Sequence, residues 1–541
     1  MRDAVSMILR IAPERVRRRV ILAPCWRPES VGIENAHPVS APESNCVWDC
    51  KVLGEAFTYI VGGVGAGLCA DIVMALGSTP CEELLFIGSA GALDKRVSIG
   101  DIVAVDESIC AEGASRYVVS GDVLKDTFGL KSATNRYLTS QIASAAKPSC
   151  DAVGVALWQG TVVSVESVFM QGRHVELFQS MGASFIDMET SAVLAASRVA
   201  GISATAVFCV SDNQLTGKHL AEVSDDEVAF RKSVRRFVMP DLIAEFSRRV
   251  SVSVVVPTYN GGAYLPECVN SLLKDPPTGL EIIIVDDGST DGTEKVADSL
   301  AASSGSVRVI KQSHGGLSSA RNTGLLAARG EYVYFVDDDD LPVSGFIKNA
   351  YEQAKRMSLD LFVFSFEPFC ESDALKKKYA KHLNGKKRTV PVPGPVSGKE
   401  LFTALTNNDE YYPVVWIQLV KKRLLVRNSI TFIDSLLFED NLYSLAVMSV
   451  AERCACSTEV GYWKRFRDGS ITISPETVEK VNSFLYTYRE MQRLAKDETN
   501  HEFRRAVEVQ ANKIMDQVKK RYERLSETQK AEILWTPDKG C

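Results

Sequence analysis

The stretch VYFVDDDD at residues 333–340 is an apolar run that ends abruptly in four carboxylates. Its apolar half is typical of a strand buried in a sheet. Four adjacent acids cannot lie in a core, so we expect them at the exposed carboxyl end of that strand, where open α/β sheets bind ligands. Their mutual repulsion favours a cationic partner, and the simplest one is a divalent metal that also binds substrate phosphates. A solvated acidic turn is the alternative interpretation.

Strands and helices alternate ahead of this stretch. The β-branched run 252–256 stops at Pro257, and a second strand at 281–285 ends in the acidic turn DDGSTDGT. A short third strand at 307–311 precedes HGGLSSARNTG at 314–324, whose second part has a helical pattern. Acids therefore follow two strands of one predicted sheet, which is a nucleotide-binding layout.

Four motifs in this half occur in a fixed order: PTYN at 257–260, VDDGSTD at 285–291, GGLSSARNTG at 315–324 and FVDDDD at 335–340. Together they resemble the family-2 glycosyltransferases of the GT-A fold. The resemblance implies a nucleotide-sugar donor, most simply a UDP-sugar, a glycan or lipid-linked hydroxyl acceptor, and Mg or Mn as cofactor. It assigns the metal to Asp337, Asp339 and Asp340. Donor contacts are expected from Tyr259, Asp286, Asp287, Arg321, Asp338, Arg465 and Arg467.

An inverting transfer also needs a base that takes the proton of the acceptor hydroxyl. The segment SLLFEDNLYSLA at 435–446 places two acids before a helical pattern, and family members carry an Asp here. Asp440 is therefore the candidate base and Glu439 the substitute. For both acids the alternative is a helix-start acid favoured by the macrodipole. For Arg321 the alternative is a helix-face arginine paired with an acid.

The first half of the chain alternates strands with glycine-rich turns, GGVGAG at 62–67 and GSAGAL at 88–93. Such turns let backbone amides approach a ligand, although tight strand-to-helix packing explains them equally well. With GTVVSVESVF at 160–169, FIDMETSAVLAA at 185–196 and FCVSDN at 208–213, they resemble the nucleoside phosphorylase and nucleosidase superfamily. The resemblance covers roughly residues 18–245.

This second resemblance implies a nucleoside site. It places the ribose hydroxyls against Glu189 and Met188, the base against Phe169, and phosphate or attacking water near Ser89. Asp212 matches the general acid that protonates the leaving purine. Without the resemblance, Glu189 would be read as a helix-start acid.

Two departures from the superfamily bear on the nucleoside reaction. Phe86 stands where the superfamily's phosphorylases carry a phosphate-binding arginine, and Met170 stands where some members carry a further arginine after the base-site aromatic. Since phosphate binds best through charge-assisted hydrogen bonds, we expect a nucleosidase that uses water, or a binding domain that has lost catalysis. A phosphate-dependent phosphorylase ranks third.

Composition limits the class of protein. The chain has 541 residues, is 45% hydrophobic and 24% charged, and carries a net charge of −6. These values fit a multidomain globular protein and give no reason to expect nucleic-acid binding. The 13 cysteines show no CxxC spacing, which favours reduced thiols and a cytoplasmic location. A basic run at 376–388 is read as a solvated loop, with contact to the anionic inner face of a membrane as the alternative.

We therefore expect two α/β domains: a nucleoside-phosphorylase-like three-layer fold at 1–247 and a GT-A fold at 251–475. Helices at 476–541 extend the second domain. The expected function is a metal-dependent inverting glycosyltransferase of surface polysaccharide synthesis, fused to a nucleoside-binding domain. Two alternatives stay open: a nucleoside-salvage enzyme with an accessory transferase, or one domain without catalysis. A homo-oligomer through the first domain is also open, because members of that superfamily are commonly oligomers.

Overall fold

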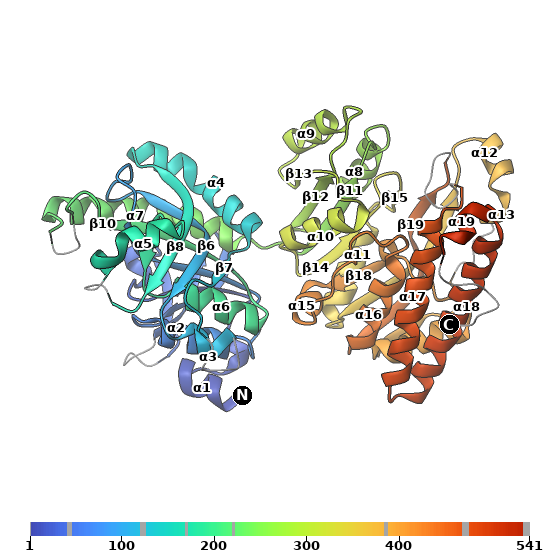
Figure 1. The fold of residues 1–541 in the computed structure, drawn as a ribbon, viewed down its shortest axis with the longest axis horizontal. Coiled ribbons are helices and arrows are strands. Elements are labelled where there is room, and N and C mark those ends of the chain that lie inside the picture. The colour runs from blue at the N-terminus through green and yellow to red at the C-terminus, as the bar shows by residue number, and fades with distance from the viewer. Residues whose placement is uncertain are drawn as a thin grey trace. The chain divides into compact units, whose positions relative to one another are not determined.

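The computed structural model describes residues 2–40, 46–119, 126–167, 171–218, 222–383, 388–467 and 475–533. The chain divides into two compact units, Met1–Arg249 and Val250–Cys541 (Figure 1). Both units are mixed α/β folds, as the alternation of strands and helices predicts. Among the described residues, no helix combines the length and the apolar character that crossing a membrane requires.

The described strands of the first unit form a ten-stranded sheet in the order β10-β6-β8-β9-β5-β1-β4-β3-β2, with β7 added to β6. Because β10 also pairs with β5, the strands β10, β6, β8, β9 and β5 form a closed ring. The strands are β1 (Arg19–Ala23), β2 (Asn35–Pro38), β3 (Cys46–Val52), β4 (Glu55–Val61), β5 (Glu83–Ala92), β6 (Ile102–Ala111), β7 (Lys131–Ala133), β8 (Leu157–Val165), β9 (Phe185–Asp187) and β10 (Ser203–Asn213).

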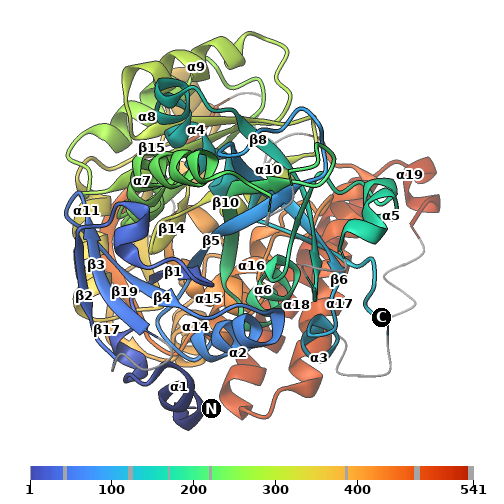
Figure 2. The same cartoon turned by 90° about the vertical axis from the view of Figure 1, so that its left-hand side faces the viewer.

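Helices cover both faces of this sheet. Val20 and Leu22 of β1 belong to one hydrophobic cluster, with residues of α2 (Ala66–Leu76) and α6 (Thr190–Ala200). The alternate residues Ile21 and Ala23 belong to another, with residues of α4 (Arg136–Val153) and α7 (Asp225–Ser247). The period of two along a strand thus produces three layers (Figure 2). The shorter helices are α1 (Arg2–Leu9), α3 (Ser115–Val119) and α5 (Val175–Ser180).

The described strands of the second unit form a nine-stranded sheet in the order β13-β12-β11-β14-β18-β16-β19-β15, with β17 added to β19. β11, β12, β13 and β14 are parallel, and β18 joins β14 antiparallel. The strands are β11 (Val252–Thr258), β12 (Leu280–Asp286), β13 (Val307–Lys311), β14 (Tyr332–Phe335), β15 (Leu341–Pro342), β16 (Leu361–Phe369), β17 (Val392–Val396), β18 (Gln418–Lys421) and β19 (Cys454–Arg465).

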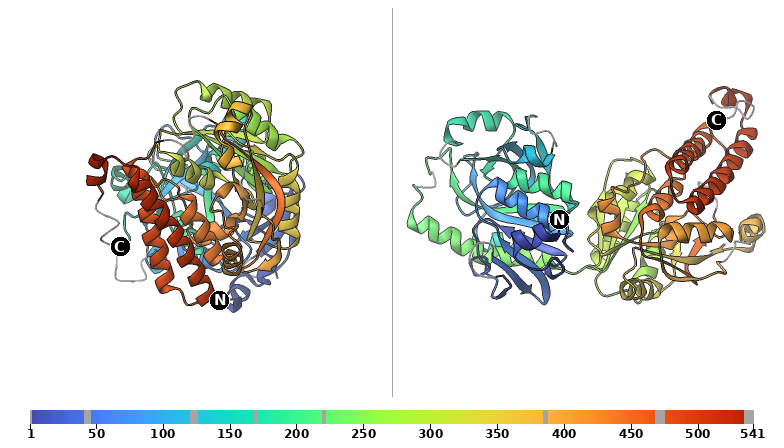
Figure 3. Two further views of the ribbon diagram at one scale, coloured as in Figure 1. Left: turned by 90° about the vertical axis from the view of Figure 1, so that its right-hand side faces the viewer. Right: turned by 90° about the horizontal axis from the view of Figure 1, so that it is seen from below.

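The helices of this unit connect the strands and extend beyond them. The connecting helices are α8 (Leu265–Leu273), α9 (Thr293–Ser303), α10 (Leu317–Ala327), α11 (Phe346–Arg356), α12 (Asp373–Lys378), α13 (Ala380–Leu383), α14 (Gly398–Asn407), α15 (Lys422–Arg427) and α16 (Asp440–Val450). α17 (Val478–Asp497) and α18 (His501–Glu523) pack on each other, red in Figure 3, and α18 also packs on α14. α19 (Glu527–Ala531) follows. The expected helical extension is therefore present.

Candidate functional site

The acid run begins two residues after the end of β14, at the carboxyl end of a strand that lies between β11 and β18. Immediately after the run, β15 pairs antiparallel with β19, which sets Leu341 opposite Trp463 and Pro342 opposite Tyr462. This pairing brings the four aspartates against the segment 462–467. The sheet therefore places acids and cations that are more than 120 residues apart in the chain next to one another.

Lys464 lies among three of the aspartates. Its Nζ is 2.9 Å from Oδ2 of Asp340, 3.2 Å from Oδ2 of Asp337 and 3.9 Å from Oδ1 of Asp339. Burial opposes the charged form of Lys464, but the carboxylates outweigh it and raise the pKa of the ammonium well above its usual range. Lys464 is therefore a buried counter-ion of the acid run.

The three aspartates predicted to bind metal differ in accessibility. The side chain of Asp340 has no exposed surface and accepts hydrogen bonds from Oη of Tyr462 at 2.6 Å and from the Arg465 amide at 2.8 Å. Asp337 and Asp339 keep 24% and 12% of their side-chain surface. Asp340 is thus enclosed by the chain, which leaves Asp337 and Asp339 as the carboxylates that a ligand could reach.

The acid run fits a divalent metal in its chemistry but not in its present arrangement. Carboxylate oxygens are the donors that Mg²⁺ and Mn²⁺ prefer, so the chemistry of the set is suitable. In the described part of the chain, however, no three acid, histidine or cysteine side chains are arranged as a ready metal site. Lys464 and Arg467 instead pair with these oxygens, so Asp337 and Asp339, which keep exposed surface, are the carboxylates that would hold a metal once the cations move.

Arg321 links the acid run to the candidate base. Its Nη2 lies 2.9 Å from Oδ1 of Asp337, and its Nη1 lies 2.8 Å from Oδ1 of Asp440 and also contacts Glu439. Arg321 is 2% exposed, and its ring neighbour is Phe432 at 5.3 Å. In this structure the guanidinium of Arg321 is buried against three carboxylates, so its contact with the donor diphosphate stays a prediction. The alternative, an arginine paired with acids, describes it.

Asp440 and Glu439 lie at the start of α16, as expected, but differ in environment. The side chain of Glu439 is 6% exposed and forms an ion pair with Arg321. The side chain of Asp440 is 16% exposed. Burial raises the pKa of Asp440, and Arg321 only partly offsets this effect. Asp440 is therefore the more accessible of the two carboxylates, and its raised pKa suits a base.

The residues predicted to bind the nucleoside part of the donor gather at the ends of β11 and β12. Tyr259 is 49% exposed, and its ring lies 4.3 Å from the imidazole of His314 with a 32° tilt. Asp287 is 3% exposed and accepts hydrogen bonds from Gln312 and from the amides of Gly315 and Gly316. Asp287 thus anchors the loop that carries His314, and the two rings form an open aromatic surface.

Two further acids support this region from within. Asp286 accepts a 3.0 Å hydrogen bond from the Ser289 amide. Asp338 accepts a hydrogen bond from Thr258, and burial raises its pKa to about 7. A Cβ on Gly261 would lie 1.9 Å from Oδ2 of Asp338, so only glycine fits there. In this structure Asp286 and Asp338 bind the chain's own turns.

Arg465 and Arg467, both predicted to contact the donor, differ in their surroundings. Arg465 is 3% exposed, donates to the Asp339 carbonyl at 2.7 Å and is paired with Glu267 and Glu371. The chain's own groups thus bind the guanidinium of Arg465, and its contact with the donor diphosphate stays a prediction. Arg467 keeps 28% of its side-chain surface and pairs with Asp339 at 2.6 Å.

The described residues predicted to bind the nucleoside lie on or next to β5, β9 and β10. Glu189 is 7% exposed and its Oε1 accepts a 2.8 Å hydrogen bond from the Gly65 amide, so its side chain points to the 62–67 glycine turn. It makes no side-chain cap on α6. Asp187 performs that role instead, accepting hydrogen bonds from the amides of Glu189 and Thr190. Burial, and then Asp187, raises the pKa of Glu189.

Asp212 lies on the strand next to this site. It is paired in register with Gly91, and a Cβ on Gly91 would lie 3.1 Å from its carboxylate. Ser211 and Gln214 each donate to it at 2.6 Å. Ser89 is exposed on β5 and Met188 is half-buried. Phe169 and Met170 lie outside the described residues, and Phe86 is fully buried against Phe208 in the core.

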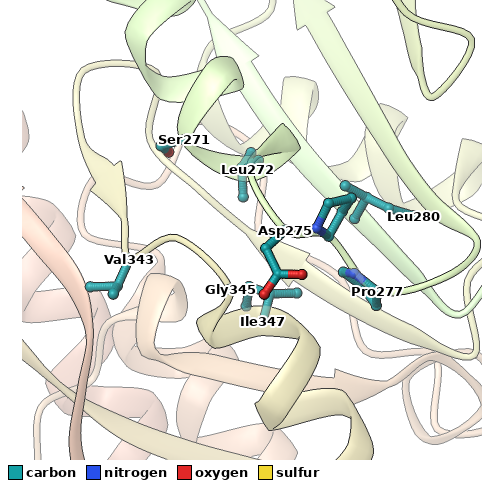
Figure 4. Close-up of a pocket in the computed structure, with 9 residues that line it drawn as sticks. Ser271, Leu272, Asp275, Pro277, Leu280, Val343, Gly345 and Ile347 are labelled. Carbon is teal, nitrogen blue, oxygen red and sulfur yellow. The ribbon is translucent and has the colours of Figure 1, made fainter.

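Neither the described part of the predicted basic run nor a small surface pocket belongs to the donor site. Arg388, part of the predicted basic run, is 3% exposed and donates to the carbonyls of Phe364 and Glu410, so it does not belong to a charged surface. A small pocket is lined by Ser271, Leu272, Asp275, Pro276, Pro277, Leu280, Val343, Gly345 and Ile347 (Figure 4). Asp275 at this pocket pairs with Lys348 at 2.9 Å. None of the lining residues is one predicted for the donor site, and we assign the pocket no function.

Sequence reasoning missed Lys464, His314 and Asp187. A signal existed for Lys464, because Tyr462 and Lys464 are two residues apart on a strand and therefore share a face. His314 directly precedes the glycine pair of a motif that had been identified. Asp187 stands two residues before Glu189 and three before Thr190, and that spacing to a helix start is typical of a capping acid.

Comparison with known proteins agrees with both resemblances. The family model for glycosyl transferase family 2 matches residues 253–409, and the model for the phosphorylase superfamily matches residues 31–239. Glycosyltransferase GlyG of Streptococcus pneumoniae is 31% identical over 225 residues, which are 41% of this chain and 72% of GlyG. The uncharacterized glycosyltransferase EpsJ of Bacillus subtilis is 33% identical over 225 residues, 41% of this chain and 63% of EpsJ. The chain thus spans just under two thirds of EpsJ.

Solved structures similar to each unit were also found. TarS of S. aureus in complex with UDP-GlcNAc is 23% identical, with a TM-score of 0.39, and covers 53% of this chain and 77% of its own. A uridine phosphorylase from Vibrio fischeri is 17% identical, with a TM-score of 0.36, and covers 42% of this chain and 92% of its own. The two family models, each matching one unit, confirm the expected fold classes, phosphorylase-like in the first unit and GT-A in the second.

Proposed function

Because the chain belongs to glycosyl transferase family 2, we propose that its second unit transfers a sugar, with inversion, from a nucleotide-sugar donor to a hydroxyl acceptor. The single observation that carries this proposal is the bonded group Asp337–Arg321–Asp440, which holds the candidate base beside the strand-end acids. A direct displacement at the sugar carbon requires the base and the donor to lie close together. The guanidinium of Arg321 contacts both the candidate base and the strand end where the donor would bind.

In the proposed reaction, the acceptor oxygen forms a bond to the anomeric carbon of the donor sugar. The bond from that carbon to the phosphate oxygen breaks, and the nucleoside diphosphate leaves with its electron pair. The acceptor proton passes to Asp440, whose raised pKa makes it a stronger base than an exposed aspartate. Arg321 keeps Asp440 in place and limits the repulsion that it feels from Glu439.

The donor we propose is a UDP-sugar. Its base would stack on the exposed aromatic surface of Tyr259 and His314, since a flat ring system favours such a surface. Arg467, which is partly exposed beside Asp339, would contact the diphosphate. Mg²⁺ or Mn²⁺ would be held by Asp339, with Asp337, and would neutralise the charge of the leaving diphosphate when bound.

The acceptor and process rest on family membership alone. We propose a glycan or lipid-linked acceptor, synthesis of a surface polysaccharide, and a cytoplasmic site of action at the inner membrane face. Asp440→Asn tests the proposal as a whole, because the variant keeps the shape of the side chain but removes the base. Transfer should fall by a factor of about 10²–10⁴ while thermal stability changes little. Unchanged transfer in Asp440→Asn would remove this residue from the mechanism.

For the first unit we propose an N-riboside site in which Glu189 binds the ribose and Asp212 donates a proton to the leaving base. Glu189 is fixed by the glycine turn, and Asp212 is held by two side-chain donors, so both carboxylates are positioned before any ligand arrives. Water is the proposed attacking group, since Phe86 occupies the position of a phosphate-binding arginine. A unit that binds the nucleoside without cleaving it is the second possibility.

A further inference from the structure

Three carboxylates of the acid run converge on one ammonium group. Nζ of Lys464 lies 2.9 Å from Asp340, 3.2 Å from Asp337 and 3.9 Å from Asp339. Its side chain is 18% exposed and its Nζ lies 5.9 Å from the ring centroid of Trp416. Carboxylates and an aromatic face are both groups that stabilise a cation, so this position is built to hold positive charge.

The backbone fixes Lys464 at this position. Lys464 belongs to β19, which is paired with both β15 and β16, and its neighbour Tyr462 donates to Asp340 from the same face of the strand. Trp416 stacks on Tyr462 with centroids 4.6 Å apart, which holds the tyrosine in turn. The ammonium can therefore leave the aspartates only by rotation of its own side chain.

The charge balance explains why the chain places a lysine here. Four successive aspartates repel one another, and Arg321 reaches only Asp337 of the four in the described contacts. Arg467 reaches Asp339, which leaves the enclosed Asp340 to Lys464. A buried carboxylate without a cation or sufficient hydrogen bonds is costly, so the folded chain keeps its own counter-ion in place.

We propose that Lys464 is an internal competitor of the divalent metal. Its ammonium binds the oxygens of Asp337 and Asp339 that the metal would need, so the lysine must turn away before the metal binds. The inference rests on the proposed function for the identity of the metal ligands. A donor diphosphate supplies an anion to which the displaced lysine can turn, so nucleotide and metal bind cooperatively.

Mn²⁺ binding to the full chain, measured by electron paramagnetic resonance without nucleotide, tests the proposal. Lys464→Met removes the charge but keeps an unbranched side chain, and it should bind Mn²⁺ at least about tenfold more tightly than the parent chain. Lys464→Arg, which keeps the charge, should bind as weakly as the parent chain. Lys348→Met removes a surface lysine paired with Asp275 and serves as the matched control. Equal Mn²⁺ affinity in Lys464→Met and the parent chain would overturn the proposal.

A second measurement uses the parent chain and stays decisive if Lys464→Met does not fold. Acetylation of Lys464 by acetic anhydride, followed by mass spectrometry, should be slow without metal and at least about tenfold faster with saturating Mn²⁺ alone, because the metal releases the ammonium. Unchanged labelling on Mn²⁺ addition contradicts the competition. Neither experiment requires turnover: a chain that shows both effects but releases no nucleotide from a sugar donor overturns the proposed transferase and not this inference.

Discussion

Nη1 of Arg321 lies 2.8 Å from Oδ1 of Asp440, and both residues are largely buried. Through Nη2 the same guanidinium lies 2.9 Å from Asp337 at the end of β14. Arg321 of α10 thus joins Asp337, which follows β14, to Asp440, the first residue of α16. The position of the candidate base is therefore set by the acid run, and the two should respond together to mutation.

Arg321→Gln should destabilise the second unit and impair transfer together. It leaves Asp337, Glu439 and Asp440 without their shared cation, and loss of one partner of a buried ion pair costs about 3–5 kcal/mol. Denaturant unfolding and the rate of UDP release measure the two effects. The matched control is Arg493→Gln, whose arginine is 74% exposed in a surface pair with Glu490. If Arg321→Gln unfolds like Arg493→Gln, the bridge has no structural role.

The transfer rate should depend on pH through Asp440. Burial raises the pKa of this group to about 7, so the base is protonated below that pH and active above it. We expect kcat/KM to rise about tenfold per pH unit below pH 7 and to level off above it. In Asp440→Asn the residual rate should lack this dependence. A rate that is flat between pH 5.5 and 8 in the parent chain speaks against Asp440 as the base.

Tyr259 and His314 should contribute to donor affinity and little to stability. Tyr259 is half-exposed and the two rings lie 4.3 Å apart, so removal of either ring uncovers no core. Stacking of a base on an aromatic side chain is worth about 1–3 kcal/mol, so Tyr259→Ala should raise the Kd for UDP by a factor of about ten or more. Calorimetric titration of UDP measures it. Tyr259→Phe should retain the affinity for UDP. If Tyr259→Phe loses as much UDP affinity as Tyr259→Ala, the uracil does not stack on this ring.

The first unit should release ribose without phosphate if it is catalytic. Phe86 is fully buried and carries no charge, so no phosphate-binding cation stands at that position. Adenosine, methylthioadenosine and uridine, each with and without phosphate, are the substrates to test. Glu189→Gln should weaken nucleoside binding, and Asp212→Asn should slow release by a factor of about 10²–10⁴ without weakening binding. Strict dependence on phosphate would exclude the hydrolase, and binding without release would leave the non-catalytic alternative.

The fold followed closely from the order of apolar runs and turn residues. VVV before Pro257 and IIIV before Asp286 are long β-branched runs, and both became fully buried parallel strands. The acid run also fell where a strand end was expected. These features depend on local periodicity and on the rule that acids avoid the core, and the sequence reports both directly.

Which acid pairs with which cation could not be predicted from the sequence in the same way. Arg321, Arg465 and Lys464 are all near the site, but a motif does not state which way a long side chain turns. Arg465 is buried with Glu267 and Glu371, which are 198 and 94 residues away in the chain. The pairing of β19 with β15 and with β16 brings these groups together, and such long-range pairing is not encoded in local spacing.

The central claim, a sugar transferase whose chemistry resides in the second unit, is tested most directly by UDP release. The full chain is incubated with a panel of UDP-sugars and Mn²⁺, beside Asp339→Asn and Asp212→Asn. We predict release by the parent chain, loss of release in Asp339→Asn, and undiminished release in Asp212→Asn. Release that persists in Asp339→Asn, or that disappears in Asp212→Asn, would contradict the claim.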